Sequence, residues 1–467
     1  MKFQFENLGL LDKAEIELAD LTIICGENNT GKTYATYAIY GFLRSWRKIF
    51  HSVLKQEIKN ILHENDRYQI NLQQLFDGKL SDYLERVCKS YTDQLHQVFA
   101  TKPPTFAKTS VKINSPENID FSRDYQSQVK AGANGKVITT ISKKRESHVL
   151  DILVTDDGLL QGQIIGLLDF ISDAIADIVF SPHLPEVHIS SAERTGAAIF
   201  RNELDIARTR MLSALQQIGS KELKRNPLRL LQEMGTTGYP WPVEDNVDFL
   251  RNLEELDKHT GKLAGEHPEI ITFFDEMLGG SYKVVKEQLV FQSKGAGKQR
   301  FTMNESSSCI RALLDVGFYL RCKAKPGELF IIDEPELNLH PKNQRAFARL
   351  VARLVNAGVK VLMTTHSDYI VKEINTLIML HQKTEHTRNA QKKYGYDDTE
   401  LLNPSCIRLY TTDMVLSDNP KGGRRIRSRT LTPATIHPER GIEVPTFDDT
   451  IEEMNTIQTE ILFGDGF

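Results

Sequence analysis

The chain contains 467 residues, which is enough for two or three folding units, at least one of them large. Hydrophobic residues make up 40% of the sequence and charged residues 26%, a composition that excludes a disordered or fibrous chain. The net charge of -4 excludes a general attraction to nucleic acid or to an anionic membrane, so any such contact needs a local basic patch.

Residues 1–50 are predicted to contain strands, a loop and a helix, in that order. Apolar and polar positions alternate over the first 24 residues and run into the apolar block Leu21-Thr22-Ile23-Ile24, which predicts strands of which the last is buried. After residue 31 the apolar residues recur at helical spacing. The segment between strand and helix matches G-x-x-x-x-G-K-[ST] and reads Gly26-Glu27-Asn28-Asn29-Thr30-Gly31-Lys32-Thr33.

This loop has the chemistry of a phosphate-binding site. Its two glycines let backbone N–H groups converge on phosphate oxygens, and the helix N-terminus adds positive potential. The lysine is expected to neutralise the β- and γ-phosphates, and the threonine hydroxyl to bind Mg²⁺. A glycine-rich turn without a ligand is the other interpretation, which the strand–loop–helix context disfavours. The expected nucleotide-binding residues are Gly26, Asn28, Asn29, Thr30, Gly31, Lys32 and Thr33, with Lys32 also catalytic and Thr33 also a metal ligand.

Residues 51–280 are expected to form an inserted lobe. Residues 51–100 look helical and charged, and 101–150 combine prolines with strand-like runs around a polar turn at 132–135. Further helices are expected at about 158–180 and from about 197 to 278, separated by a short strand-like segment at 187–189. Because no apolar heptad pattern is sustained, we expect a compact, mainly helical lobe without a long coiled coil.

From residue 281 onward the pattern predicts strands alternating with helices. Strands are expected at 328–332 and 359–363, and helices at 307–323, at 342–356 and from 367. This alternation is typical of parallel strands joined by crossover helices. The last eighty residues are polar, and a loop-rich extension is expected from about residue 384, with a final helix at 448–462.

Two of these predicted strands end in residues suited to phosphate chemistry. The first ends in Asp333-Glu334, where Asp333 is expected to bind Mg²⁺ and Glu334, pointing the other way because strand side chains alternate, to activate the attacking water. A solvated strand end is the other interpretation, which the phosphate loop in the same chain disfavours. The second strand ends in His366, which the next parallel strand would place beside the acidic pair to bind the γ-phosphate, with a structural histidine as the alternative.

Together these motifs resemble the ABC/SMC-like ATPases. The resemblance covers residues 1–50 and 280–380, and Glu334–Pro341 and Thr365–Ser367 look most like the OLD-type branch, which includes ATPase subunits of bacterial anti-phage systems such as PARIS. It implies an α/β fold in which residues 1–50 and 281–467 form an ABC-type P-loop nucleotide-binding domain, with ATP and Mg²⁺ as cofactors. It also implies homo-oligomers in which paired domains sandwich two ATP molecules.

In such a sandwich each ATP is completed by a signature serine from the other copy. The matching segment here is Glu305–Arg311, in which Ser307 is the expected serine and Cys309 stands where the family has glycine. A one-residue slip would select Ser306 or Ser308 instead, and a serine-rich helix cap is the alternative interpretation.

Two further segments have two interpretations each. Ser190–Gly196 resembles a Pro-Ala-x-Arg-x-Gly element of the same branch, so Arg194 either reports the phosphate state to the lobe or is a structural residue. The basic run at 421–429 either contacts nucleic acid or an acidic protein, or is a solvated loop.

The resemblance also implies partners. The family's nucleases carry a Toprim domain with a D-x-D metal motif, and no D-x-D occurs in this sequence, so a Toprim-type nuclease effector is expected on a separate chain. The effector would be held inactive and released when a phage-encoded trigger protein is sensed. Nucleic acid is a possible ligand that this role does not require. An HNH nuclease partner and a DNA-repair ATPase remain the alternatives.

Cysteine usage and hydropathy indicate the compartment. The five cysteines are scattered without a C-x-x-C pair, which is typical of a reducing environment. Neither a signal-peptide pattern nor an apolar stretch of membrane-spanning length is found. We therefore expect a cytoplasmic protein without a membrane partner.

Overall fold

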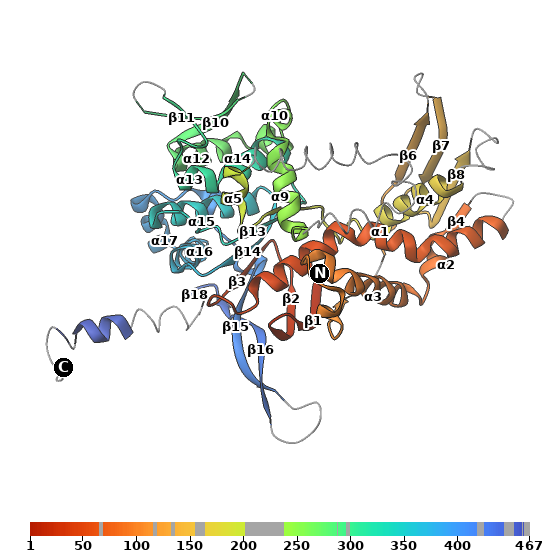
Figure 1. The fold of residues 1–467 in the computed structure, drawn as a ribbon, viewed down its shortest axis with the longest axis horizontal. Coiled ribbons are helices and arrows are strands. Elements are labelled where there is room, and N and C mark those ends of the chain that lie inside the picture. Colours follow the sequence, from red (N-terminus) through yellow and green to blue (C-terminus); the bar gives the residue numbers. More distant parts are fainter. Residues whose placement is uncertain are drawn as a thin grey trace, which may run out of the picture.

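A six-stranded sheet forms the centre of the fold (Figure 1). The computed structural model describes residues 1–64, 69–114, 119–131, 136–154, 164–200, 238–286, 288–295, 299–417, 425–442, 453–459 and 461. In spatial order the strands of the sheet are β16 (Ile426–Pro433), β15 (Ile407–Ser417), β3 (Leu21–Cys25), β14 (Lys360–Thr365), β13 (Leu329–Asp333) and β9 (Val187–Ser190). The strands from β15 to β9 are parallel, and β16 is antiparallel to β15. The strands predicted at 328–332 and 359–363 are thereby confirmed.

The two faces of this sheet belong to two hydrophobic clusters. Along β13, Leu329 and Ile331 pack into one cluster, whereas Phe330 and Ile332 pack into the other. Helix α1 covers the first face, and three later helices cover the second. Their bounds are Lys32–Glu64 for α1, Leu314–Phe318 for α14, Pro341–Asn356 for α15 and Asp368–Leu380 for α16. Strands buried on both faces explain why β3 is apolar except for Thr22, and β13 except for its last residue, Asp333.

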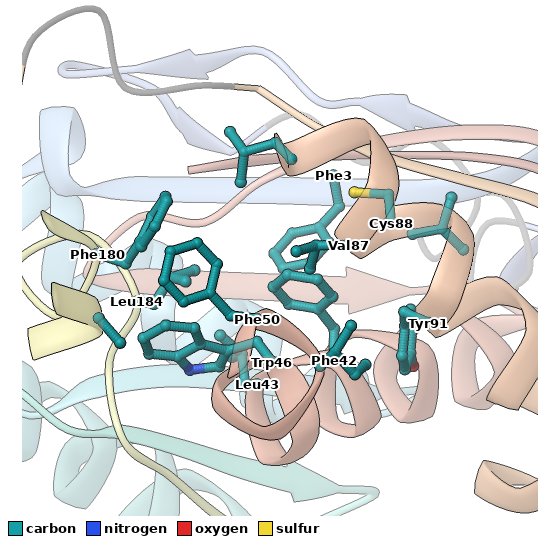
Figure 2. Packing of buried hydrophobic residues seen from close by; sticks show 14 of the residues in the cluster. Phe3, Phe42, Leu43, Trp46, Phe50, Val87, Cys88, Tyr91, Phe180 and Leu184 are labelled. Carbon is teal, nitrogen blue, oxygen red and sulfur yellow. The ribbon is translucent and has the colours of Figure 1, made fainter. Parts of the chain in front are cut away.

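Helix α1 joins the sheet to the inserted lobe. Its 33 residues correspond to a length of about 50 Å. Aromatic side chains along one side of α1 pack against other elements (Figure 2), and the rings of Phe50 and Phe180 meet edge to face at 4.6 Å. Phe42 packs in the same way against Tyr91 of α3 (Leu80–Val98). The glycine-rich loop that precedes α1 is therefore joined to the lobe by one continuous, packed helix.

The lobe contains both helices and strands, and two strands of the 51–280 region join sheets that also contain strands from outside it. Strand β5 from the 51–280 region pairs with β1, and β9 from the same region pairs with β13. The expected boundaries of the inserted lobe are therefore not boundaries of the sheets, and the division into domains stays a prediction. The elements of this part are β1 (Lys2–Leu8), β2 (Leu11–Glu17), β4 (Gln69–Asn71), α2 (Leu72–Phe76), η1 (Pro103–Phe106), β5 (Ser110–Ile113), β6 (Tyr125–Ala131), β7 (Lys136–Lys143), β8 (Val149–Val154) and α4 (Ile164–Val179).

A group of short helices and a small sheet follow β9. The turn expected at 132–135 and the helices expected at 201–237 lie outside the described residues. The single helix predicted at 307–323 is wrong, because Leu313 leaves the helical backbone conformation with φ -110° and separates α13 from α14. The elements are α5 (Arg194–Ile199), α9 (Trp241–Arg251), α10 (Leu253–Leu256), α11 (Lys262–Glu266), α12 (Pro268–Leu278), β10 (Gly280–Val285), β11 (Gln288–Ser293), β12 (Arg300–Thr302), α13 (Ser308–Ala312) and a π-helical turn (Tyr319–Lys323).

The C-terminal part is more regular than the loop-rich extension that the sequence predicts. Strands β15 and β16 form a hairpin that extends beyond the sheet (Figure 1). The prediction missed the hairpin because its far end is exposed on both strands, which removes the apolar alternation that marks a strand. The remaining elements are α17 (Glu385–Tyr394), η4 (Asp398–Glu400), η5 (Pro404–Cys406), β17 (Ile436–His437) and β18 (Gly441–Ile442).

The helix predicted at 448–462 is described only in part, and residues 453–459 are helical. In the portion of the chain that the structure describes, no helix combines the length and the apolarity that crossing a membrane requires.

Candidate functional site

The phosphate loop follows β3 at one edge of the central sheet. Gly26 and Gly31 adopt φ values of 143° and 104°, which L side chains rarely adopt. A Cβ atom on Gly26 would also lie 2.0 Å from Oγ1 of Thr412. Thr412 in turn donates a hydrogen bond of 2.9 Å to the Thr30 hydroxyl inside the loop. Strand β15, which the sequence did not predict, therefore supports the loop from one side.

Lys32 lies at the centre of the loop. Its ammonium group donates to the backbone carbonyls of Gly26 at 2.8 Å and Glu27 at 2.7 Å, and only 3% of the residue is exposed. Burial lowers the pKa of Lys32, and the charges of Glu334 and Asp333 act in the opposite direction. The lysine is thus a buried cation that faces the acidic pair across the strand ends.

Three strand ends meet beside this loop. In the sheet β14 lies between β3 and β13, with Thr365 opposite Cys25 and Thr364 opposite Asp333. Because parallel strands end at the same edge, the segments after β3, β13 and β14 lie together. The structure therefore brings together the loop, the acidic pair and His366, which the sequence separates by about three hundred residues.

Asp333 is fully buried and has an unpaired oxygen. Its Oδ1 accepts a hydrogen bond from the Thr364 hydroxyl, whereas its Oδ2 has no hydrogen-bond partner in the described part of the chain. Burial raises the pKa of Asp333 to about 6, and the bond from Thr364 opposes this change. An unpartnered carboxylate oxygen fits Mg²⁺, which prefers oxygen ligands. Thr33, half-buried in the first turn of α1, is the second expected ligand.

Glu334 lies just beyond the end of β13 in a left-handed conformation with φ 49°. Its side chain is therefore directed by this turn and not by the strand alternation that the sequence analysis assumed. The Glu334 N–H donates to Thr364 Oγ1 at 3.0 Å, and its carboxylate lies 3.8 Å from Nδ1 of His366. A non-glycine residue with positive φ costs energy and is enriched at functional sites.

His366 is oriented by Glu336, a residue that the sequence analysis did not select. Oε1 of Glu336 lies 3.1 Å from Nδ1 of His366 and accepts the His366 N–H at 2.6 Å and the Thr365 hydroxyl at 2.9 Å. Oε2 of Glu336 is buried without a hydrogen-bond partner among the described residues. The signal was available in Glu334-Pro335-Glu336, where a second carboxylate follows the first at two residues' distance.

Arg194 lies behind the acidic pair. It is 1% exposed and donates to the backbone carbonyls of Asp333 at 2.6 Å and Glu334 at 2.7 Å. All of its acceptors here are backbone oxygens, so the structure shows how Arg194 is held, and its role in reporting the phosphate state stays a prediction.

Ser307 and the basic run lie away from these contacts. Ser307 is exposed and caps α13, since its hydroxyl accepts from the Ile310 N–H at 3.4 Å. The helix-cap interpretation therefore applies within one chain, and the role across a dimer stays a prediction. Of the basic run, Lys421 and Arg424 lie outside the described residues, whereas Arg427 and Arg429 lie on β16.

Comparison with known proteins gives a family and a set of distant structures. A family model described as AAA ATPase domain matches residues 1–371. A search of the curated proteins found no match. Among solved structures, the SMC head domain from Thermotoga maritima is similar at 11% identity and a TM-score of 0.31, over 93% of this chain and 98% of that chain.

A second solved structure is the Smc head domain with an extended coiled coil bound to the C-terminal domain of ScpA, derived from Pyrococcus furiosus. It is similar at 11% identity and a TM-score of 0.32, over 98% of each chain. At these TM-scores neither likeness supports an argument, and the family match does not depend on them.

The expected fold class is confirmed as an α/β P-loop nucleotide-binding fold, and the described ranges contain no long coiled coil. The match covers well over half of the chain and includes the phosphate loop, the acidic pair and His366. The chain belongs to the AAA ATPase domain family.

Proposed function

We propose that this chain binds ATP with Mg²⁺ at the edge of the central sheet and hydrolyses it. The proposal is supported by the meeting of three strand ends, beside which Lys32, the acidic pair and His366 lie. Thr33 and Asp333 would bind Mg²⁺, which neutralises phosphate charge when bound. Glu334 orients and deprotonates the attacking water, and His366 donates to the γ-phosphate.

The test compares ATP binding with ATP turnover in purified protein. Glu334→Gln keeps the shape of the side chain and removes the base, so we expect kcat to fall about 10²- to 10³-fold while ATP still binds. Glu385→Gln, an exposed residue in the first turn of α17, is the matched control and should hydrolyse ATP like the unchanged protein. Full turnover by Glu334→Gln would reject the assignment of the base.

We further propose that two copies pair around two ATP molecules and that Ser307 completes the site of the other copy. Ser307 is exposed at the start of α13, so a second chain has access to it. The Glu334→Gln protein should dimerise on adding ATP, as measured by light scattering, because bound ATP is not consumed. A monomer at saturating ATP and micromolar protein would exclude the sandwich.

The proposed role is that of an ATPase subunit in an anti-phage defence complex. The chain would act as a sensor and scaffold that holds a separate Toprim-type nuclease and releases it when a phage-encoded trigger protein binds. Support comes from Glu334–Pro341 and Thr365–Ser367, which look most like the ATPase subunit of the PARIS system. A two-gene pair with an HNH nuclease is the nearest alternative.

A DNA-binding repair ATPase of the SMC-like type is the second candidate. The exposed far end of the β15–β16 hairpin favours it, because Arg425 and Arg427 lie there together. Hydrolysis should then rise on adding duplex DNA, and the effect should fall steeply between about 50 and 200 mM salt. The defence role predicts instead that a nuclease chain co-purifies without any DNA requirement, and that phage restriction in cells needs both chains.

A further inference from the structure

The segment that follows β9 places one buried guanidinium between the acidic pair and α13. Arg194 donates from Nη1 to the Asp333 carbonyl at 2.6 Å and from Nη2 to the Glu334 carbonyl at 2.7 Å. Its Nε donates to the carbonyl of Ala312, the last residue of α13, at 2.9 Å. Nη1 also donates to the Ser191 carbonyl at 3.0 Å. Arg194 thus donates four hydrogen bonds to backbone carbonyls in three separate segments.

One peptide group is fixed from both sides by this arrangement. The carbonyl of the Asp333–Glu334 peptide accepts from Arg194, and the N–H of the same peptide donates to Thr364 Oγ1 at 3.0 Å. The same Thr364 hydroxyl donates to the Asp333 carboxylate. The carbonyl on the far side of Glu334, whose φ is 49°, is fixed by Arg194 as well. The directions of both carboxylates therefore depend on Arg194.

The charge of this guanidinium is balanced from the α14 side. Asp315 is fully buried and accepts from the Ser190 hydroxyl at 2.5 Å and from Asn246 Nδ2 at 2.9 Å. Burial lowers the pKa of Arg194, and the Asp315 charge is the largest effect that opposes this. Ser190 ends β9, Asn246 lies in α9 and Asp315 lies in α14, so the hydrogen bonds of Asp315 join these three elements.

We propose that Arg194 is a positioning residue that couples the direction of Glu334 and Asp333 to the position of α13, the helix that Ser307 caps. This inference rests on the proposed function and deepens it. Contact of Ser307 with a nucleotide on a second copy would shift α13. Such a shift displaces the Ala312 carbonyl that Nε of Arg194 binds, and so turns the guanidinium plane that fixes the Asp333–Glu334 peptide. Arginine is required because only a planar guanidinium has enough N–H donors, in a fixed geometry, to bind three segments at once.

The test uses the conservative change Arg194→Lys, which keeps the charge and loses the fork. A displacement of the reacting groups by about 1 Å lowers turnover about 10²-fold, so we expect kcat per bound nucleotide to fall by about that factor. Binding of a fluorescent ATP analogue should change by less than about threefold, since Lys32 and the loop are unaffected. A wild-type kcat per bound nucleotide in Arg194→Lys would overturn the proposal.

Arg321→Lys is the matched control. Arg321 is 17% exposed and likewise donates to a backbone carbonyl, that of Tyr282 at 2.7 Å, and to a carboxylate, that of Asp275 at 2.5 Å. We expect this change to lower the melting temperature and to leave kcat per bound nucleotide within about twofold of the unchanged protein. An equal loss of kcat in both variants would reduce Arg194 to a structural role and overturn the coupling.

Two further variants keep the proposal testable if Arg194→Lys does not fold. Asp315→Asn weakens the charge that balances Arg194 without touching the acidic pair, so kcat should fall about tenfold at unchanged ATP affinity, and an unchanged kcat would overturn the proposal. Added to Glu334→Gln, the Arg194→Lys change should lower kcat by less than about threefold relative to Glu334→Gln alone, because both changes act through the Glu334 carboxylate. A full additional loss would contradict that shared route.

The proposed function and this inference fail in different ways. If the unchanged protein does not hydrolyse ATP, both are rejected. If it hydrolyses ATP and Arg194→Lys matches it per bound nucleotide, only the coupling is rejected.

Discussion

The two sides of the nucleotide site satisfy their polar groups differently. On the loop side, residues 26–33, the Lys32 ammonium already binds two carbonyls of its own loop, and the Thr30 hydroxyl donates to the Glu27 carbonyl at 2.7 Å. On the acidic side, residues 333–336, Oδ2 of Asp333 and Oε2 of Glu336 are buried without a hydrogen-bond partner among the described residues. Buried polar groups are seldom left unpaired. A ligand must therefore displace existing hydrogen bonds on the loop side, whereas on the acidic side it meets unpaired oxygens.

This difference separates binding from metal chemistry. The loop side must exchange its internal hydrogen bonds for phosphate contacts, so its contribution to ATP affinity is a difference between two sets of bonds. The acidic side loses nothing when a cation arrives and gains a partner for a desolvated carboxylate. We therefore expect changes on the loop side to affect ATP affinity most, and changes on the acidic side to affect Mg²⁺ dependence, turnover and stability.

The largest expected effect is on the loop side. Lys32→Ala removes the cation that faces the phosphates, and charge-assisted hydrogen bonds of this kind contribute up to about 3 kcal/mol, which is an ATP affinity loss of about 10²-fold. Equilibrium binding of ATP with Mg²⁺ measures it. Lys48→Ala, an exposed position on the same helix, is the control. Unchanged affinity in Lys32→Ala would show that the loop side does not determine ATP binding.

On the acidic side the burial of Asp333 predicts a pH-dependent cost. Its pKa of about 6 in the folded chain lies above the 3.8 of an exposed aspartate, so the folded state favours the protonated form. Stability is then lost as pH rises from about 4 to 6, by about 3 kcal/mol in total, and the loss persists above pH 6. Asp333→Asn removes this titration.

The measurement is urea unfolding of both proteins without nucleotide, in EDTA, at pH 4 and pH 7. The stability of Asp333→Asn relative to the unchanged protein should increase by about 2 kcal/mol between these two pH values, whatever the fixed cost of the amide. The same variant should lose the effect of Mg²⁺ on ATP binding. A difference that does not vary with pH would show that the unpaired oxygen carries no such cost.

The same contrast explains what the sequence could predict. The loop, Asp333-Glu334 and His366 follow apolar strands and belong to local patterns, so the sequence places them at one sheet edge. The support from Thr412 comes from a strand without apolar alternation, and the four bonds of Arg194 join segments from residue 191 to residue 334. Contacts of that kind join residues far apart in the chain and depend on three-dimensional packing, so local sequence patterns cannot predict them.

A smaller effect is expected at Glu336, which orients His366. Glu336→Gln keeps an acceptor for the Thr365 hydroxyl but replaces a buried charge that lies 3.1 Å from Nδ1 of His366. We expect kcat to fall about tenfold, because the ring loses its charged partner and not its position in the strand end. The ratio of this loss to that of His366→Gln decides the role of Glu336. A larger loss in Glu336→Gln would mean that Glu336 acts on the nucleotide directly.

The smallest effect is expected at Ser307, which neither side of the site includes. Ser307→Ala removes the cap of α13, whose bond to the Ile310 N–H is long at 3.4 Å, so the stability loss should be about 0.5 kcal/mol. If a second copy completes the site, kcat should in addition fall at protein concentrations that favour the dimer and remain unchanged in dilute monomer. A stability loss alone, with equal kcat at all concentrations, would confine the site to the loop and acidic sides of one chain.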